Sequence, residues 1–330
     1  MIHQSILSAA PLRISFVGGG TDIFSFYSKF GGEVISASIN KYVYVHIKRH
    51  DPLFQEKYRI SYSEVEHTNS RNSIRNDIVR SCLEFLDFDE PLQISTSSDL
   101  PSNSGLGSSS SFCVALLSGL HAIRGEDVSA AQLAEEACFI EIDMLKGNIG
   151  KQDQYAAAVG GFNHYIFGND GKVTIAPITS SNHFIEEFFR HSVLVWTGLA
   201  RNASTILKEQ DSRNKTNEGN LLELKALVSE FLSVAQLIEI DLVKSSKIMQ
   251  QGWELKKSFA TSIVTPEITE IENALISAGA IGYKLLGAGG GGFILSTFAN
   301  LPEMSNSFLP SWSKFKPKID NLGVRVVSRI

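Results

Sequence analysis

The stretch PSNSGLGSSSSF at residues 101–112 places flexible glycines directly before an apolar helix that we expect over residues 108–123. The first turn of a helix leaves several backbone N–H groups without intrahelical acceptors. Together with the positive end of the helix, these donors form a ready site for a phosphate. The serines that follow add hydroxyls suited to phosphate or magnesium, although an ordinary Ser/Gly helix cap would explain the same residues. A Walker A loop is excluded, because the segment has no lysine.

A second glycine segment, GAGGGG at 287–292, matches the dinucleotide fingerprint GxGxxG in form only. That fingerprint requires a helix directly after the glycines and an acidic residue about 20 positions later. The strand-like GFILSTF follows instead, and no acid stands at position 307. A tight hairpin turn is one interpretation. A close approach of the backbone to a ligand is equally open, because successive glycines weaken a fold unless something needs the room. Gly289 and Gly290 are then candidate substrate contacts.

The third glycine segment, FVGGGTD at 16–22, follows the apolar strand pattern LRISFV. Three glycines would suffice for a turn. The pair Thr21–Asp22 adds hydrogen-bonding groups suited to sugar hydroxyls, so we predict a substrate site at Gly19, Gly20, Thr21 and Asp22. Arg13 lies upstream and is expected near the same edge of the sheet.

An acidic stretch follows the middle of the chain, IEIDMLKGNIGKQDQYAAAVGGFN at 140–163. Glu141 falls late in an expected helix, glycines then interrupt the chain, and Asp153 begins a new segment. A solvated surface charge is the ordinary interpretation of any single carboxylate. Asp153, however, stands next to the small apolar run YAAAV, which indicates partial burial.

The remaining pattern predicts a mixture of strands and helices, with the polar stretch at 179–182 as the domain boundary. Because the alternation lacks a regular βαβ period, it favours a mixed α+β sandwich over a doubly wound sheet. Strands are expected over 42–48, 91–101, 192–198 and 323–330, a hairpin over 161–178, a strand, glycine turn and strand over 283–298, and helices over 72–88, 108–123, 129–145, 200–213, 216–240 and 266–278.

Bulk properties narrow the class of protein. The formal net charge is −5, without the basic excess of a protein that wraps nucleic acid. Three cysteines at wide spacings form neither a CxxC pair nor a disulfide framework, which fits a reducing cytoplasm. The chain shows no signal peptide and no apolar run of the roughly 18 residues that cross a membrane. We therefore expect a cytoplasmic protein without a nucleic-acid or membrane partner.

Together, the segments APLRISFVGGGTD, LPSNSGLGSSSS and KLLGAGGGGFIL resemble, in this order, the three motifs of the GHMP kinase superfamily. That superfamily includes galactokinase, homoserine kinase, mevalonate kinase and phosphomevalonate kinase. The resemblance covers essentially the whole chain, and three ordered motifs are far more specific than one. Within the superfamily the chain looks most like the sugar 1-kinases that act on D-glycero-D-manno-heptose 7-phosphate. The strings GGGTD, GKQDQYAAAVGG and TGLARNASTIL carry this narrower match.

The resemblance implies roles for individual residues. Asp153 falls where galactokinase-like members have the carboxylate that accepts the proton of the sugar hydroxyl, and Arg13 matches the arginine near the transferred phosphoryl group. Glu141 and a serine of the 108–109 pair, preferably Ser109, fall at the magnesium-ligand positions. The ATP phosphates would be held by Pro101, Ser104, Gly105, Leu106, Gly107, Ser108, Ser109 and Ser110.

For the sugar, Asp22 matches the aspartate that binds hydroxyl groups. GGGTD replaces the GEHTD of galactokinase, so the contacts made there by Glu and His are missing, which argues against galactose. The implied reaction is ATP-dependent phosphorylation of an anomeric hydroxyl, giving heptose 1,7-bisphosphate for nucleotide-activated heptose synthesis. Another GHMP substrate (fucose, an N-acetylhexosamine or mevalonate) and a catalytically silent binding protein are the alternatives. A nicotinamide-dependent oxidoreductase built on GAGGGG is disfavoured by the missing helix and acid.

The implied fold has two domains, expected at 1–180 and 181–330. The first resembles ribosomal protein S5 domain 2 and carries the ATP loop, and the second is ferredoxin-like, with ATP and sugar in the cleft between them. A homodimer is a candidate assembly.

The segment TGLARNASTILKEQ suggests a site for a phosphate already on the substrate. Arg201 and Lys208 are seven residues apart, which places them on one face of a helix. Arginine suits a bidentate grip on a phosphate. A pair of solvated surface cations is the alternative, more so for Lys208 than for Arg201.

Overall fold

The computed structural model describes residues 4–51, 53–179, 183–200, 214–305 and 307–330. In this part of the chain the strands form two sheets, one of eight strands and one of four. The large sheet contains β1 (Ser5–Val17), β2 (Gly32–Arg49), β3 (Tyr58–Ser61), β4 (Val65–Thr68), β5 (Leu92–Ser98), β6 (Phe162–Phe167), β7 (Val173–Pro177) and β12 (Arg325–Arg329). The small sheet contains β8 (Ser192–Trp196), β9 (Ala280–Leu285), β10 (Phe293–Phe298) and β11 (Lys314–Phe315).

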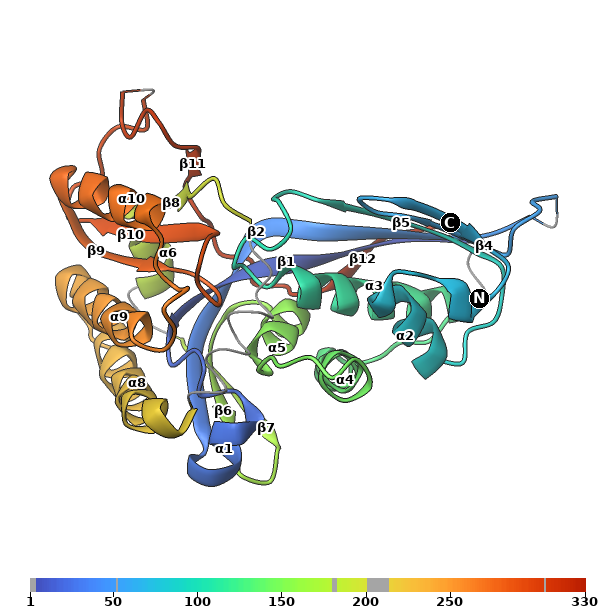
Figure 1. Ribbon diagram of the computed structural model, residues 1–330, viewed down its shortest axis with the longest axis horizontal. Coiled ribbons are helices and arrows are strands. Elements are labelled where there is room, and N and C mark those ends of the chain that lie inside the picture. The colour runs from blue at the N-terminus through green and yellow to red at the C-terminus, as the bar shows by residue number, and fades with distance from the viewer. Residues whose placement is uncertain (1–3, 52, 180–182, 201–213, 306) are drawn as a thin grey trace.

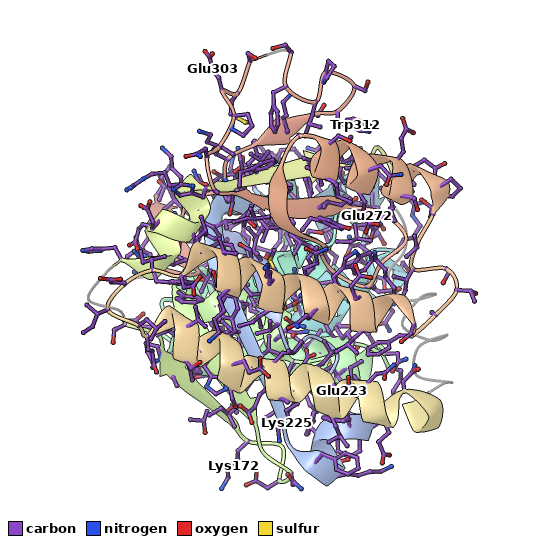
Figure 2. The ribbon with its side chains drawn as sticks, turned by 90° about the vertical axis from the view of Figure 1, so that its left-hand side faces the viewer. Lys172, Glu223, Lys225, Glu272, Glu303 and Trp312 are labelled. Carbon is purple, nitrogen blue, oxygen red and sulfur yellow. The ribbon has the colours of Figure 1, made fainter. Side chains whose placement is uncertain are left out.

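Helices cover both sheets (Figure 1). The helices are α1 (Phe24–Phe30), α2 (Asp77–Phe85), α3 (Ser108–Arg124), α4 (Ala130–Cys138), α5 (Gln152–Val159), α6 (Phe184–Arg190), α8 (Asn214–Ala235), α9 (Leu242–Lys257) and α10 (Pro266–Ser277), with short 3₁₀ and π-helical turns at Arg71–Ser73 and Phe139–Met144. Helices α2 to α5 lie along one face of the large sheet, α9 and α10 pack against β9 of the small sheet, and α8 packs against α9, β1 and β2. Figure 2 looks onto α8 and α9, which run side by side. No helix in the described ranges is long and apolar enough to cross a membrane.

Strand β1 is the central element of the molecule. It pairs antiparallel with β2 along its whole length, and its residues from Ser8 to Val17 are buried. The register shifts between Pro11 and Leu12, where proline has no N–H to donate to the ladder. The buried carbonyl of Pro11 accepts a hydrogen bond of 2.7 Å from the hydroxyl of Ser111 of α3. This contact helps to fix the first turns of α3 against the sheet.

Helix α3 begins where the sequence places it, and it is almost entirely buried. Gly107 precedes it with φ of 78° and Gly125 follows it with φ of 80°, conformations that favour glycine. The helix expected at 129–145 is shorter. Ser129 caps α4 by accepting from the backbone N–H of Gln132, but after Cys138 the chain forms a π-helical turn that contains Glu141. Such turns insert an extra residue and often lie at functional sites.

Other elements differ from the sequence prediction. Helix α2 begins at Asp77 and not at 72, because the side chain of Asn76 caps it by accepting from the backbone N–H of Val79. Helix α9 was not predicted. Its mean hydropathy is low and its buried positions are separated by polar residues, although Asp241 caps its start. The helix expected at 200–213 lies almost wholly outside the described residues, as do most of the polar stretch at 179–182 and the domain boundary at 180.

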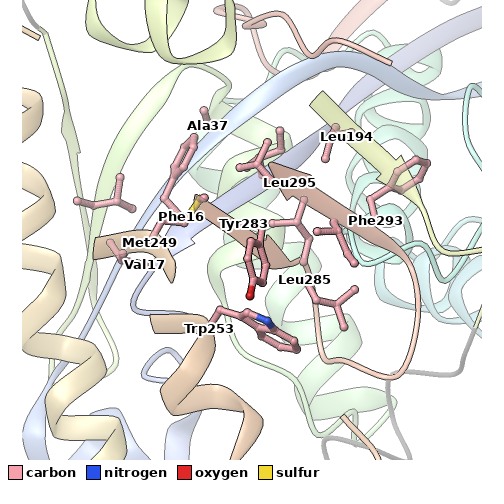
Figure 3. Packing of buried hydrophobic residues seen from close by; sticks show 14 of the residues in the cluster. Phe16, Val17, Ala37, Leu194, Met249, Trp253, Tyr283, Leu285, Phe293 and Leu295 are labelled. Carbon is pink, nitrogen blue, oxygen red and sulfur yellow. The ribbon is translucent and has the colours of Figure 1, made fainter. Parts of the chain in front are cut away.

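The hydrophobic core runs from the end of β1 into the small sheet without interruption (Figure 3). Phe16 stacks on Phe231 of α8 at a ring-centroid distance of 5.5 Å and meets the edge of Phe188 at 5.4 Å. Trp253 of α9 packs beside Tyr283 and Leu285 of β9. After the small sheet the chain returns to the large one, where β12 pairs with β1. The two sheets are therefore joined both by a shared core and by the C-terminal strand.

Candidate active site

A cavity lies where β1, the three glycine segments, the start of α5 and the end of α9 meet. It is lined by Arg13, Ser15, Gly19, Gly20, Asp22, Ile23, Asn103, Gly105, Gly107, Ser108, Ser109, Ser110, Glu141, Ile149, Gly150, Gln152, Asp153, Leu224, Gly252, Lys256, Lys284, Gly287 and Ala288. Segments that are far apart in the sequence thus contribute to a single site.

A bidentate ion pair forms one wall of the cavity. Arg13 Nε donates to Asp153 Oδ1 at 2.7 Å and Arg13 Nη2 donates to Oδ2 at 2.8 Å. The remaining terminal nitrogen, Nη1, donates to the carbonyl of Gly105 at 2.7 Å. Paired parallel hydrogen bonds between guanidinium and carboxylate are among the strong ones in proteins and fix orientation. Asp153 is thereby held at the start of α5, facing the glycine segment that precedes α3.

A buried carboxylate lies next to this pair. Glu141 Oε1 accepts from the hydroxyl of Ser109 at 2.8 Å, and Oε2 accepts from the side-chain amide of Gln154 at 2.7 Å. Burial raises the pKa of Glu141, and hydrogen bonds from Ser110, Ser109 and Gln154 oppose this effect, while the charge of Asp153 adds to it. The π-helical turn at 139–144 orients the side chain towards the first turn of α3.

The third carboxylate, Asp22, lies in a tight backbone cradle. Its Oδ1 accepts from the backbone N–H of Gly20 at 3.0 Å, and its Oδ2 accepts from that of Gln152 at 3.2 Å. A Cβ on Gly150 would lie 1.9 Å from Oδ2, so only glycine fits at that position. Burial and the charge of Asp153 raise the pKa of Asp22.

Two polar atoms on the cavity wall have no hydrogen-bond partner in the described part of the chain. These are the hydroxyl Oγ of Ser15 and the side-chain carbonyl Oε1 of Gln152, both fully buried. Buried polar groups are normally paired, because leaving one unpaired costs free energy. Two unpaired polar atoms in residues that line one cavity make these residues candidates for contact with a polar ligand.

The glycine segments before α3 and after β9 pack directly against each other. A Cβ on Gly287 would lie 2.4 Å from the Cα of Gly105, and one on Gly105 would lie 2.4 Å from the carbonyl oxygen of Leu286. The backbone N–H of Phe293 also donates to the carbonyl of Ser104 at 3.1 Å. The glycines at 105 and 287 are therefore required by close backbone contact between the two halves of the molecule.

Two lysines complete the cavity, and sequence reasoning singled out neither. Lys284 of β9 is buried, and its ammonium donates to the carbonyls of Ser15 at 2.9 Å and Phe16 at 2.7 Å. Burial, and then the charges of Lys256 and Arg13, hold its pKa well below the usual value. Lys284 is the first residue of the motif KLLGAGGGG, so its position beside a glycine segment could have identified it as a site residue. Lys256 lies on α9, a helix that was not predicted, so its sequence context gave no reason to place it here.

The structure brings most of the predicted site residues together. The backbone or side chains of Arg13, Gly19, Gly20, Asp22, Gly105, Gly107, Ser108, Ser109, Ser110, Glu141 and Asp153 line the cavity. Their geometry suits the assigned chemistry, while the individual roles stay predictions.

The other predicted residues within the described part of the chain do not line the cavity. The hydroxyl of Thr21 donates to the carbonyl of Glu33 at 2.8 Å and accepts from its N–H at 2.9 Å, which uses it within the fold. Gly289 and Gly290 pack against Ile263, whose carbonyl accepts from the N–H of Gly290 at 2.8 Å.

Within the ATP loop, three of the predicted contacts also lie elsewhere. Leu106 is a core residue and the side chain of Ser104 is buried beneath the loop, while Pro101 is exposed outside the cavity. Arg201 and Lys208 lie outside the described residues.

Magnesium fits the corner formed by Ser109 and Glu141. A hydroxyl and a carboxylate are the oxygen ligands that this ion prefers, and it usually takes one or two carboxylates together with substrate phosphates and waters. A bound cation would also offset the cost of burying the charge of Glu141. The described residues contain no group of three or more His, Cys, Asp or Glu side chains that could hold a metal ion, so phosphates would have to share in its binding.

Comparison with known proteins agrees with this geometry. The family model "GHMP kinases N terminal domain" matches residues 76–161, and "GHMP kinases C terminal" matches residues 233–306. The chain is 32% identical over 302 residues to the D-glycero-alpha-D-manno-heptose 7-phosphate kinase of Campylobacter jejuni subsp. jejuni, with 88% of each chain covered.

Solved structures share the fold. A putative sugar kinase from Campylobacter jejuni superposes with a TM-score of 0.71 at 24% identity, covering 100% of both chains. Galactokinase of Lactococcus lactis in complex with galactose gives a TM-score of 0.72 at 17% identity, covering 98% of this chain and 95% of that one. The expected two-domain GHMP kinase fold is confirmed, and the chain belongs to the GHMP kinase family.

Proposed function

We propose that this protein transfers the γ-phosphoryl group of ATP to the anomeric hydroxyl of D-glycero-D-manno-heptose 7-phosphate, giving the 1,7-bisphosphate. The observation that carries the proposal is the Arg13–Asp153 pair, which faces both the glycine segment before α3 and the Asp22 cradle. A base between an anion site and a hydroxyl-binding carboxylate is the arrangement that phosphoryl transfer to a sugar needs. The choice of sugar rests on the relative that is 32% identical over 88% of each chain.

The ATP phosphates would be bound at the first turn of α3. The first turn of α3 has backbone N–H groups without intrahelical acceptors, and the serines at 108–110 line the cavity. Anion binding at a helix N-terminus combines unpaired donors with the helix dipole. Ser109 and Glu141 would hold magnesium, which when bound neutralises negative charge on the phosphates.

Asp153 would orient the anomeric hydroxyl and accept its proton as the new bond to phosphorus forms. General-base assistance of this kind contributes about 10²–10⁴-fold to rate. Arg13 keeps the carboxylate in place through two hydrogen bonds and supplies positive charge beside the transferred group. Little covalent chemistry is required of the protein, because positioning and electrostatic stabilisation account for most of phosphoryl-transfer catalysis.

The sugar would lie against Asp22, Ser15 and Gln152. The carboxylate of Asp22 is held by backbone donors, and Ser15 and Gln152, each with an unpaired polar atom in the described part of the chain, line the same cavity. A phosphate site at Arg201 and Lys208 stays a prediction that concerns residues outside the described part of the chain. The compartment, expected to be the cytoplasm, and the candidate homodimer also stay predictions.

A substrate panel tests the proposal. Initial rates with ATP and magnesium would be compared for heptose 7-phosphate, the dephosphorylated heptose, galactose, fucose, an N-acetylhexosamine and mevalonate, with an Asp153→Asn preparation as the control for contaminating kinases. We expect heptose 7-phosphate to exceed every other acceptor in kcat/KM by about 10²-fold or more, since buried polar groups left unpaired penalise the wrong substrate. A higher kcat/KM with any other acceptor would contradict the proposed substrate. Equal use of the dephosphorylated heptose would remove the phosphate site at Arg201.

A further inference from the structure

Lys256 lies one turn after Gly252 near the end of α9, and both residues line the cavity. The spacing of four places them on the same face of the helix. The ammonium of Lys256 donates to the carbonyl of Gly287, which belongs to the glycine segment that packs against Gly105. The charge is therefore located at the junction of the two glycine segments, beside the anion site before α3.

Four charged groups face this ammonium from the elements around it. Arg13 on β1 and Lys284 on β9 are cations, whereas Asp22 and Asp153 are carboxylates that line the same cavity. None of the carboxylates in the described part of the chain lies within ion-pair distance of Lys256. Its direct protein partner there is a single neutral carbonyl, so donors of the ammonium remain for a ligand.

The neighbouring lysine is the natural comparison. Lys257 pairs with Glu254 at 3.0 Å and with Glu272 at 3.1 Å, and its ammonium lies over the ring of Trp253. These contacts balance its charge within the protein and raise its pKa, against the effect of burial. For Lys256, burial and the charge of Arg13 instead lower the pKa to about 8. The fold thus favours the charged form of Lys257 and disfavours the charged form of Lys256.

The positive charge of Lys256 is unfavourable in the free protein, and a bound anion would offset this effect. Groups with a shifted pKa that lie in a cleft are often part of a functional site. The ligand would be an anion, because the ammonium of Lys256 lies without an ion-pair partner among the described residues and beside the anion site before α3, where Arg13 and Lys284 are the other cations and Asp153 already pairs with Arg13. Lys284 already donates to two carbonyls, and Arg13 uses its donors on Asp153 and Gly105. Lys256 is the cation of the three with the fewest protein partners among the described residues.

We propose that Lys256 is a further catalytic residue, whose ammonium binds the phosphoryl group while that group passes from ATP to the sugar. This inference rests on the proposed function. In the step, the bond between the γ-phosphorus and the ADP oxygen breaks, a bond to the sugar oxygen forms, and the hydroxyl proton goes to Asp153. Lys256 stays protonated throughout and donates hydrogen bonds to the equatorial oxygens, on which negative charge spreads.

The test compares Lys256→Met and Lys256→Arg with the matched control Lys257→Met. Removing a donor aimed at transition-state charge costs about 10²–10³-fold in kcat. We therefore expect Lys256→Met to lose at least about 10²-fold in kcat, with KM for ATP and sugar within a few-fold of the unmodified enzyme. Lys256→Arg should recover part of the loss. Lys257→Met should keep near-normal kcat.

Thermal unfolding separates a catalytic from a structural role. Because the charge of Lys256 is unfavourable in the free protein, Lys256→Met should unfold at the same Tm or a higher one, whereas Lys257→Met should unfold at a lower Tm. The kcat/KM of the unmodified enzyme should also fall as pH rises through about 8, the pKa of this ammonium in the free enzyme, and the fall should be absent in Lys256→Met. A lower Tm with unchanged kcat in Lys256→Met would overturn the proposal, as would a loss confined to the KM of the sugar phosphate.

A binding experiment makes the inference testable without the sugar. We would measure the affinities of the unmodified enzyme, Lys256→Met and Lys257→Met for ADP with magnesium. The same affinities would be measured with aluminium fluoride added as a mimic of the transferred group. Lys256→Met should weaken the fluoride complex by at least about tenfold and leave ADP affinity nearly unchanged. Equal affinities of Lys256→Met and the unmodified enzyme for the fluoride complex would refute the role. If the unmodified enzyme prefers another sugar, only the proposed substrate fails, and the same kcat comparison with that sugar still tests Lys256.

Discussion

Arg13 directs all of its observed side-chain donors at two groups. Two nitrogens hold both oxygens of Asp153, and the third holds the carbonyl of Gly105 in the segment before α3. Because the guanidinium is planar and always charged, this arrangement fixes the carboxylate relative to the anion site and balances its charge. A lysine at position 13 would supply the charge without the two parallel hydrogen bonds.

The first prediction at this scale concerns Asp153. Asp153→Asn keeps the size of the side chain but removes the proton acceptor, so kcat should fall by at least about 10²-fold while KM for ATP changes little. Steady-state kinetics on the folded variant provide the measurement, with Asp170→Asn on the exposed β6–β7 turn as the control. Near-normal kcat in Asp153→Asn would show that another group accepts the proton.

The second concerns the proposed metal ligands. Ser109→Ala and Glu141→Gln each remove or weaken an oxygen ligand for a hard cation, so the magnesium concentration at half-maximal rate should rise in both. Titration of the rate with magnesium at saturating ATP is the measurement. Ser102→Ala, which changes an exposed serine outside the cavity, is the control. An unchanged magnesium dependence in both variants would contradict the assignment of Ser109 and Glu141 as ligands, and Ser108 and Asp143 would be the next candidates.

At the scale of elements, the cavity depends on two glycine segments that touch through their backbones. Gly287 has a φ of 75°, and a side chain there would meet the backbone of Gly105. This contact holds the loop before α3 against the loop after β9, and so joins the phosphate site to the second sheet. Gly287 thus requires glycine both for its positive φ and for lack of space. Another glycine of the chain has a positive φ without the close contact, so the two effects can be measured separately.

Gly287→Ala and Gly279→Ala form the matched pair. Gly279 has a φ of 83° and nothing within 4 Å of a built Cβ, so its substitution tests strain alone. That strain costs about 1–2 kcal/mol. Gly287→Ala adds the clash, and should lower Tm further and weaken ATP binding, whereas Gly279→Ala should leave ATP binding intact. Thermal unfolding and nucleotide titration give both numbers, and equal effects of the two variants would disprove the packing role.

His121, in the last turn of α3, connects this helix with α4 and with the loop between the two helices. The ring nitrogen Nδ1 of His121 forms a hydrogen bond of 2.5 Å with Oε2 of Glu126, and Nε2 forms one of 2.9 Å with Oε2 of Glu136. Burial alone would lower the pKa of His121, but the hydrogen bonds and charges of Glu136 and Glu126 outweigh it and raise the pKa. The stabilisation is therefore fully present below the unfolded pKa of about 6.5 and is lost as pH rises through the folded pKa.

This predicts a pH-dependent difference between the unmodified protein and His121→Gln. The Tm of the variant should be lower by a few degrees near pH 6, in line with roughly 2–4 °C per kcal/mol for a larger domain. The difference should shrink towards pH 9. Thermal unfolding across this range is the measurement, and a difference that stays constant with pH would contradict a charged His121.

The sequence predicted these elements unevenly, for physical reasons. The glycine loop before α3 was accessible because glycine, serine and a following apolar helix form a local signal. Helix α9 was missed because its exposed faces carry many lysines and glutamines, and Lys256 was missed with it. Thr21 was assigned to substrate by its neighbourhood to Asp22, but its hydroxyl is used by the backbone of Glu33, a contact between strands that no local pattern reveals.

At the scale of the whole molecule, the cavity exists because two sheets share a core. Phe16 packs among aromatic rings from α6 and α8, and Lys284 of the small sheet donates to carbonyls of β1. The resemblance carried by the three ordered motifs implied the two-domain fold, with ATP and sugar in the cleft between the domains. It did not predict that β12 would return to pair with β1, because pairing between the two ends of a chain leaves no trace in local periodicity.

The structure of the product shows whether the phosphoryl group is transferred to the anomeric oxygen. Purified protein would be incubated with ATP, magnesium and D-glycero-D-manno-heptose 7-phosphate, and the product analysed by phosphorus and proton NMR. We expect a second phosphorus signal coupled to the proton on carbon 1, which the unmodified protein produces at least about 10²-fold faster than Asp153→Asn. A new phosphate coupled to any other carbon, or ATP consumption with no second phosphate on the sugar, would contradict transfer to the anomeric oxygen.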